Sequence, residues 1–212
     1  MPKVTTEYKI KKKQLIIEAM VEVLQRKPLY EITMLDVIQE AKLSKGGIYL
    51  YFSDIDELLI ETINYLVEKH SVIEFVKEDL SGDVESDLLM IFQKLGDYME
   101  SCPPIISKIR SELVIYITNY PEKTDRYKST LVLQETGEQF MKMTAWLIQD
   151  GIVKKVFRQD INMDVVMMNI SVYLDGMSEA VVNSVVYKNG FLQFPIKDYL
   201  QQFIQSFIQY LK

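Results

Sequence analysis

The sequence predicts an all-α protein, and three observations lead to this fold class. The 212 residues contain only six Pro and eight Gly, so long stretches are free of helix breakers. Apolar residues recur at helical spacing along most of the chain, and no segment shows the alternating pattern of a half-buried strand. Hydrophobic residues make up 48% and charged residues 25%, as in a globular protein with a buried core. We therefore expect nine helices and no sheet.

Capping residues and breakers set the boundaries of the first three helices. An amphipathic helix is expected over 9–27, and Pro28 ends it. Thr33 is followed three residues later by a carboxylate, which is the signature of a helix N-terminus, so a short second helix begins there. Ser44 is a suitable N-cap for a third short helix that runs to about Leu50.

Six further helices follow, separated by prolines, glycines and polar loops. Asp54 and Glu57 form another capping pattern and open the fourth helix. The later helices are expected over 84–101, 104–119, 122–150 and 164–188, and from Pro195 to the end. We expect two domains, a three-helix domain over 1–53 and a larger helical domain over 54–212.

Charge is distributed unevenly along the chain. The net charge is −6, from 24 basic and 30 acidic side chains. Residues 1–53 hold nine of the basic and six of the acidic side chains, which leaves 15 basic and 24 acidic side chains for the rest. A basic head and an acidic body suit a protein whose head meets phosphates. A chance distribution is the alternative interpretation.

Several classes of function lack support in the sequence. The single cysteine, Cys102, excludes an internal disulfide and fits a reducing cytoplasm. No apolar run approaches the roughly 18 residues that span a bilayer, and no signal-peptide core follows the basic start. We expect a cytoplasmic protein without a membrane partner. With one histidine, His70, and no metal-ligand spacing or catalytic constellation, we expect neither an enzyme nor a metal or other cofactor.

Three short helices near the N-terminus form a unit that can hold a recognition helix against a DNA groove. The residues themselves match a known pattern in three runs: Thr33-Met34-Leu35-Asp36-Val37, Ala41-Lys42-Leu43-Ser44-Lys45-Gly46-Gly47-Ile48-Tyr49-Leu50-Tyr51-Phe52, and Asp56-Glu57-Leu58. Over about residues 10–58 the chain resembles the DNA-binding domain of the TetR family. The rest resembles the family in length and helix count, which implies a nine-helix TetR-like architecture.

The resemblance implies a homodimer that binds operator DNA, an inverted repeat, through its N-terminal helix-turn-helix domain. Family members use the C-terminal domain to dimerise and, usually, to sense a small molecule. We therefore expect a sequence-specific transcriptional repressor that a small apolar effector releases from its operator. The alternatives are a transcriptional activator, and an adaptor that binds DNA or another protein without an effector.

The same resemblance assigns DNA contacts to seven residues. They are Thr33, Ser44, Lys45, Gly46, Gly47, Tyr49 and Tyr51. Thr33 would contact a phosphate through its hydroxyl and backbone amide, since a helix N-terminus attracts anions. Residues 44–47 open the recognition helix and would face the major groove, where glycines let a backbone approach closely. The two tyrosines would reach phosphates on either side of that groove.

The sequence departs from the family pattern at four positions. Ile38 stands where a small residue lets the two helices of the motif approach. Lys42 stands at the turn position usually filled by Gly, so we expect it in a left-handed conformation. Gly47 replaces a common Thr, and Ile55 replaces a Lys that often touches phosphate. The first two affect the helix crossing and the last two affect single contacts.

Methionine and aromatic residues crowd the second half of the chain. Core packing at helical spacing explains any single one of them, but a pliable cavity for an apolar effector is the alternative, since Met adapts its shape. The candidate pocket residues are Tyr116, Phe140, Met143, Trp146, Tyr173 and Met177.

Apolar stripes on the last two helices are candidates for the dimer interface. Two stripes from each subunit would form a four-helix interface. The stripe residues are Ile170, Leu174, Met177 and Val181 on the eighth helix, and Phe203 and Phe207 on the ninth. Packing inside their own chain is the alternative.

Overall fold

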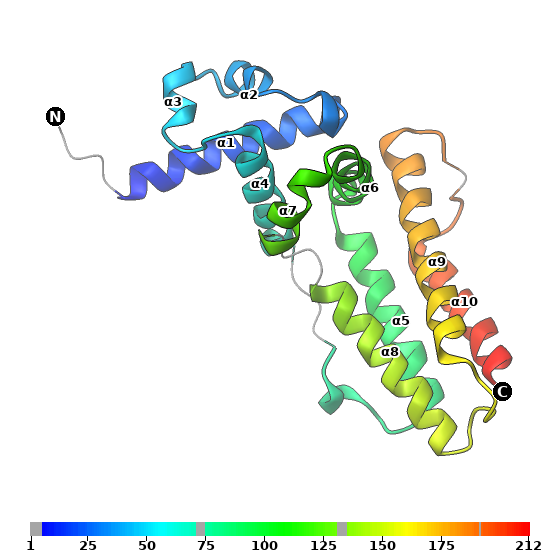
Figure 1. Cartoon of the computed structure of the whole chain (residues 1–212). Coiled ribbons are helices and arrows are strands. Elements are labelled where there is room, and N and C mark those ends of the chain that lie inside the picture. Colours follow the sequence, from blue (N-terminus) through cyan, green and yellow to red (C-terminus); the bar gives the residue numbers. More distant parts are fainter. Residues whose placement is uncertain (1–5, 71–74, 131–134, 191) are drawn as a thin grey trace. The chain divides into compact units, whose positions relative to one another are not determined.

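The computed structural model describes residues 6–70, 75–130, 135–190 and 192–212, and within these ranges helices joined by loops and turns are present and no strand is. The all-α prediction is confirmed. The helices of the N-terminal part are α1 (Thr6–Arg26), α2 (Met34–Ala41), α3 (Lys45–Tyr49) and α4 (Ile55–Lys69). They are followed by α5 (Val84–Ser101), α6 (Pro104–Asn119), α7 (Thr124–Thr130), α8 (Glu135–Val153), α9 (Met163–Val181) and α10 (Ile196–Leu211). The described ranges thus hold ten α-helices, one more than expected (Figure 1).

The additional helix comes from the stretch 122–150, where a single helix was expected and the structure has α7 and α8. Residues 131–134, between them, lie outside the described residues. The two helices contribute buried side chains to different cores. Tyr127 of α7 is buried and bonded to Asp56, whereas Phe140 of α8 packs 5.0 Å from the ring of Phe92. Hydrophobic periodicity marks both as helical but does not show that the buried partner changes between them.

The chain forms two compact units. The first contains Met1–Lys69 and Lys108–Val132, and the second contains His70–Ser107 and Leu133–Lys212. Helix α4, most of α6 and α7 therefore group with the N-terminal helices. The functional division expected at residue 53 stays a prediction, because compactness does not show which part acts as a domain.

In the first unit, both α2 and α4 pack against α1. Its buried residues Ile16, Met20 and Leu24 lie on one side, where α1 packs against α2 and α4. Val37 of α2 and Ile48 of α3 are fully buried, so each short helix is fastened by an apolar anchor. These anchors matter because helices this short are not stable alone.

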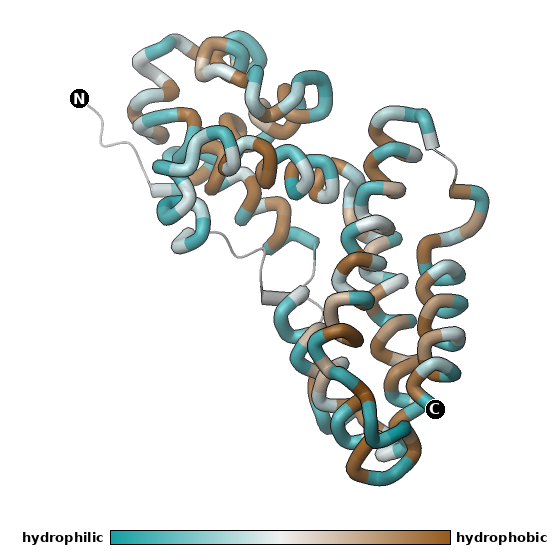
Figure 2. Tube along the Cα trace, turned by 45° about the vertical axis from the view of Figure 1, so that its right-hand side comes forward, coloured by the Kyte–Doolittle hydropathy of each residue, from teal (hydrophilic) through white to brown (hydrophobic). Residues whose placement is uncertain are grey.

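In the second unit, α5, α8, α9 and α10 run roughly along one another (Figure 1). Hydrophobic and hydrophilic residues alternate along each helix at helical spacing, as Figure 2 shows. The core includes Phe92, Phe140, Ile170 and Ile204. Helices α5 and α10 pack closely at Gly96, where an added Cβ would lie 2.8 Å from the Cα of Lys197. A glycine is thus needed there for the helices to meet.

Helix α9 continues into a π-helical turn, η5 (Val182–Val186). Residues 163–186 are long and apolar enough to cross a membrane, by length and composition alone. The sequence analysis expected no unbroken apolar run of this length, and Asp164, Asp175 and Glu179 do interrupt this stretch, which reaches the level only as an average over its residues. Within its most apolar 18-residue window, 33% is buried. A single such helix is weak evidence for a membrane span, since core helices of soluble proteins pass the same test.

Candidate nucleic-acid interface

Local hydrogen bonds define the start of α2. Thr33 and Asp36 form a complete capping box, in which the Thr33 side chain accepts from the Asp36 backbone N–H (3.4 Å). In return, the Thr33 backbone N–H and hydroxyl both donate to Asp36 Oδ2, at 2.9 and 2.8 Å. Both groups that were expected to reach phosphate are therefore engaged by Asp36, and a phosphate would have to share or replace these bonds.

The turn between α2 and α3 follows the sequence expectation. Lys42 caps α2 in the left-handed region, with φ 52° and ψ 40°. Ser44 then caps α3 by accepting a hydrogen bond from the Gly47 backbone N–H at 3.1 Å. Two capped helices joined by a tight left-handed turn are the local geometry of a helix-turn-helix.

Two ion pairs hold α2 against the end of α1. Lys27 donates to Asp36 at 2.5 Å, and Arg26 pairs with Glu40. Burial alone would raise the pKa of Asp36, but the hydrogen bonds from Lys27 and Thr33 outweigh burial and keep its pKa below the usual value. Asp36 is thus charged at neutral pH and balanced by Lys27.

Few side chains project from the outer surface of α3. Ile48 is buried, Gly46 is exposed without a side chain, and Gly47 is half-buried. Lys45 and Tyr49, one turn apart, are both exposed, and the Lys45 ammonium lies 5.8 Å from the centre of the Tyr49 ring. A lysine over an aromatic face is a favourable cation–π arrangement.

The structure brings all seven predicted DNA-contact residues into one segment, from the start of α2 to just after α3. Thr33, Ser44, Lys45, Gly46 and Tyr49 are exposed, whereas Gly47 and Tyr51 are half-buried. The contacts themselves stay predictions. Their common placement on one short segment is what a groove-reading surface requires.

Helix α6 contacts the end of α1 through a buried ion pair, Lys108–Glu112, which the sequence pattern did not predict. The Lys108 ammonium donates to the carbonyls of Leu24 (2.7 Å) and Lys27 (2.9 Å), which lie at the C-terminus of α1. Glu112 accepts from Lys108 at 3.1 Å and from the backbone N–H of Leu29 at 2.8 Å. A cation at a helix C-terminus satisfies carbonyls that have no partner within the helix.

A second buried cluster surrounds Asp56 at the start of α4. Asp56 is 8% exposed and accepts hydrogen bonds from the hydroxyls of Tyr116 (2.9 Å) and Tyr127 (2.8 Å). Lys123 pairs with the same carboxylate at 2.9 Å. Burial alone would raise the pKa of Asp56, but these three donors outweigh it and lower the pKa. The cluster ties α6 and α7 to α4.

Comparison with known proteins settles what this architecture is. Residues 16–62 match the family profile of bacterial regulatory proteins, tetR family. The match begins inside α1 and ends inside α4, so it includes both helices of the motif and the turn between them. Residues 16–62 are a DNA-binding domain of the TetR family.

Similarity extends beyond this DNA-binding domain. The chain is 28% identical over 157 residues to the uncharacterized HTH-type transcriptional regulator YfiR of Bacillus subtilis (strain 168), which covers 74% of the chain and 73% of the relative.

Two solved structures show that the fold is shared along almost the whole length. A TetR transcription regulator from Haloarcula marismortui superposes with a TM-score of 0.58 at 18% identity, over 95% of this chain and 98% of the other. A transcriptional regulator from Saccharomonospora viridis in complex with choline gives 0.54 at 17% identity, over 93% and 95%.

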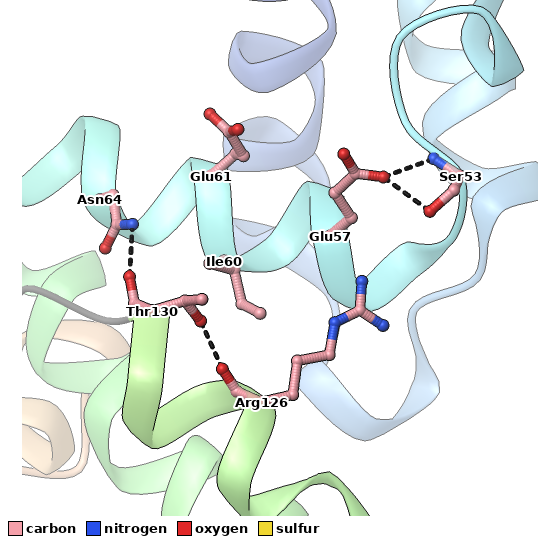
Figure 3. Close-up of a pocket in the computed structure, with 7 residues that line it drawn as sticks. All are labelled: Ser53, Glu57, Ile60, Glu61, Asn64, Arg126 and Thr130. Atoms are coloured by element: carbon pink, nitrogen blue, oxygen red, sulfur yellow. Dashed lines mark hydrogen bonds between the residues drawn. The ribbon is translucent and has the colours of Figure 1, made fainter.

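A pocket lies between α4 and α7, within the first unit (Figure 3). It is an open hollow of about 480 Å³ whose walls combine polar and apolar surface, and none of the predicted effector residues lines it. Its lining residues are Ser53, Glu57, Ile60, Glu61, Asn64, Arg126 and Thr130. Glu57 accepts from the Ser53 N–H and hydroxyl, both at 2.7 Å, and Asn64 donates to the Thr130 carbonyl at 2.8 Å.

The predicted effector residues occupy several environments. Phe140, Met143 and Met177 are buried, whereas Trp146 is exposed beneath the Lys77 ammonium, 4.2 Å from the ring centre. Tyr173 stacks on Phe203 at 3.8 Å. The sixth residue, Tyr116, belongs to the other unit, where its hydroxyl is bonded to Asp56. Their role in effector binding stays a prediction.

The predicted dimer residues pack largely within their own chain. Ile170, Met177, Val181 and Phe207 are buried, whereas Leu174 and Phe203 are half-buried. A different apolar stripe was not predicted, because periodicity locates apolar faces but does not show which of these faces the chain itself covers. This exposed stripe on α9 consists of Val165, Met168 and Val172.

The Asp56 cluster predicts the effect of Asp56→Asn on stability. Loss of the carboxylate leaves Lys123 without its charge partner, so the free energy of unfolding at pH 7 should fall by about 3 kcal/mol. Because the folded pKa of Asp56 is lowered, the wild-type advantage is present above the unfolded pKa of about 3.9 and disappears as pH falls through the folded value. Urea unfolding from pH 7 to pH 2 measures the difference.

The matched control for this experiment is Asp125→Asn, which removes an exposed carboxylate on α7 and should leave stability nearly unchanged. A stability difference between Asp56→Asn and wild type that stays constant down to pH 2 would contradict the assigned role of the charge.

Proposed function

We propose that this regulator is a homodimer that represses transcription by binding an inverted-repeat operator, and that a small apolar effector releases it. The observation that carries the proposal is the exposed surface of α2 and α3 in a chain whose family consists of DNA-binding regulators. A dimer would place two copies of α3 in successive major grooves, roughly 34 Å apart. We place the protein in the cytoplasm, where operator DNA is accessible.

The DNA-binding part is tested by a binding selection against sheared genomic DNA. Wild type should recover an inverted repeat. If each dimer neutralises about six phosphates, a log–log plot of affinity against salt should have a slope near −5. Fluorescence anisotropy on a recovered duplex at several salt concentrations measures the slope. A slope near zero would refute the phosphate contacts, and recovery of unrelated sequences would favour the adaptor alternative.

The exposed stripe on α9 supports the dimer. Met168 is 63% exposed and Val172 is 62% exposed, although both are apolar. Gly176, one turn further along the same side, is also exposed, and a Cβ there would meet no atom within 4 Å. A glycine inside a helix costs stability relative to alanine, and here no neighbour in the chain requires it. A second copy packed on this face would cover the apolar residues and use the close approach.

The dimer proposal predicts that Val172→Glu produces a folded monomer. A charge buried between two copies costs several kcal/mol when unpaired, whereas the exposed site of the free subunit tolerates it. Analytical ultracentrifugation measures the mass, and circular dichroism checks folding. Val153→Glu, at an exposed valine near the end of α8, is the control and should remain dimeric. An unchanged dimer in both variants would exclude this stripe as the interface.

The proposal of an effector is supported by the methionines around the core of the second unit. Met141, Met163 and Met167 are partly buried against this core, and methionine repacks more readily than branched residues. The structurally similar regulator from Saccharomonospora viridis was solved with choline, so this architecture accommodates a small molecule.

The effector proposal predicts that a compound which raises the melting temperature of the free protein also lowers its operator affinity. A ligand that shifts the equilibrium away from the DNA-binding state must bind the two states unequally. Phe140→Ala should abolish the thermal response to the compound, while Val153→Ala, at an exposed residue outside the candidate pocket, serves as the control and should keep it. Compounds that stabilise the protein without affecting operator binding would point to the effector-independent alternative, and tighter operator binding would point to activation.

A further inference from the structure

One aromatic ring in the core of the second unit comes from an irregular segment that backbone hydrogen bonds do not fix. Of the buried core residues of this unit, only Phe75 and Phe157 lie outside α5, α8, α9 and α10. The Phe157 N–H donates to the Gly151 carbonyl at 3.1 Å, whereas no backbone hydrogen bond joins Phe75 to another described residue. Phe75 is therefore the core ring that can leave without breaking a hydrogen bond of the main chain.

The site that Phe75 fills is closely packed. Phe75 is 9% exposed, and its ring centre lies 5.4 Å from that of Phe140, which in turn lies 5.0 Å from that of Phe92. Protein interiors are packed too densely to admit an additional ring. A ligand that enters here, between α5 and α8, must take the place of a side chain, and Phe75 can move without unwinding a helix.

Two residues further along, Lys77 covers an aromatic ring of α8. Its ammonium lies 4.2 Å from the ring centre of Trp146, and no ion pair within the described part of the chain involves Lys77. Trp146 is 41% exposed, so solvent reaches the ring. The face of tryptophan is the aromatic surface that attracts cations most strongly. Phe75 and Lys77 thus occupy an apolar site and a cation site of the same unit.

The segment that carries both side chains, residues 75–80, is called the strap here, and it is attached to the helices mainly at one end. Asp79 pairs with Lys94 of α5 at 2.6 Å, but both side chains are exposed, and such pairs contribute little to stability. Firmer bonds begin just after the strap, where the N–H groups of Ser81 and Gly82 donate to the buried Asp87. The strap can therefore swing away while the chain beyond it stays in place.

The second unit also carries nearly all of the negative charge. Its two segments contain nine basic and 16 acidic side chains, whereas the first unit contains 15 basic and 14 acidic side chains. The field around an acidic unit attracts small cations and repels anions. Charge therefore favours a positively charged ligand at a site in this unit.

We propose that the effector is an amphipathic organic cation, and that it binds by displacing the strap. Its apolar group takes the place of the Phe75 ring beside Phe140, and its ammonium takes the place of Lys77 on Trp146. In the ligand-free protein, the chain's own phenylalanine and lysine are an internal competitor for the two sites. The inference rests on the proposed function, because it specifies the chemical class of the effector and the place where it binds.

The ligand class is tested with three probes that share a phenylbutyl group and differ in the head group: phenylbutylamine, which is protonated at pH 7, phenylbutanol and phenylbutanoate. Calorimetry measures affinity, and the fluorescence of Trp146, the single tryptophan, reports on the site. The amine should bind about 2- to 5-fold more tightly than the alcohol, and the carboxylate more weakly than both. Trp146→Leu should remove the preference for the amine over the alcohol. Equal affinities of wild type for amine and alcohol would overturn the cation site.

Displacement of the strap is tested with Phe75→Ala and its matched control Phe157→Ala. Both remove a buried phenylalanine of the same core from outside its helices, and circular dichroism checks folding. Phe75→Ala should bind the amine about tenfold or more tightly, because the competing ring is gone, whereas the control should bind as wild type does. Phe75→Leu and Phe157→Leu replace this pair if alanine prevents folding. Unchanged, weaker or undetectable binding by the folded Phe75 variant would overturn the proposal.

The competing ammonium is tested with Lys77→Met, which keeps the apolar stem and removes the charge. Its affinity for the amine should rise by about 2- to 5-fold, since the ligand no longer displaces a cation from Trp146. The control is Lys142→Met, which removes an exposed lysine one turn before Trp146 on α8 and should bind the amine as wild type does. An equal change in both variants would reveal a general effect of charge and overturn the competition.

Operator binding separates this inference from the function on which it rests. If the amine binds with the expected variant pattern but leaves operator affinity unchanged, the proposed release by an effector is refuted and the site stands. If another compound releases the protein from its operator and Phe75→Ala binds it no more tightly than wild type does, the release stands and displacement of the strap is overturned.

Discussion

The ammonium of Lys108, buried beneath the end of α1, is the contact on which the geometry of the DNA-binding unit depends. It satisfies the carbonyls of Leu24 and Lys27, which have no partner inside α1. The chain leaves α1 at this point and enters the motif through Leu29, whose N–H is bonded to Glu112. The direction in which the chain reaches α2 is therefore set by α6, a helix that follows far later in the sequence.

A polar cluster at each end of this arrangement makes α6 and α7 part of the DNA-binding unit. Lys108 and Glu112 hold the end of α1, and the Asp56 cluster holds the start of α4. Buried charges carry a large desolvation cost and contribute little net stability. They do, however, permit only one arrangement of partners, because any shift leaves a charge unpaired. The orientation of the helices that lead into and out of the motif is thus specified more sharply than apolar packing alone would achieve.

Local features were predictable from the sequence, and long-range ones were not. The capping residues Thr33 and Ser44 act within four residues of themselves, so their roles follow from spacing, as does the left-handed Lys42. The buried roles of Lys108 and Asp56 depend on partners up to 84 residues away. When such a partner is unknown, a lysine or aspartate in a helix is predicted to be solvent-exposed. The exposed stripe of α9 was missed for a related reason, since periodicity does not distinguish an outer apolar face from one that the chain covers.

The bare surface of α3 has a consequence for the evolution of this regulator. After a gene duplication, a copy acquires a new target by changing the side chains that meet the bases. In most recognition helices such a change removes an existing contact first. Here Gly46 offers a position at which a substitution adds a group without meeting any atom of the chain and improves helix propensity at the same time. Divergence of specificity therefore need not pass through an unstable intermediate, which leaves this lineage free to explore new operators.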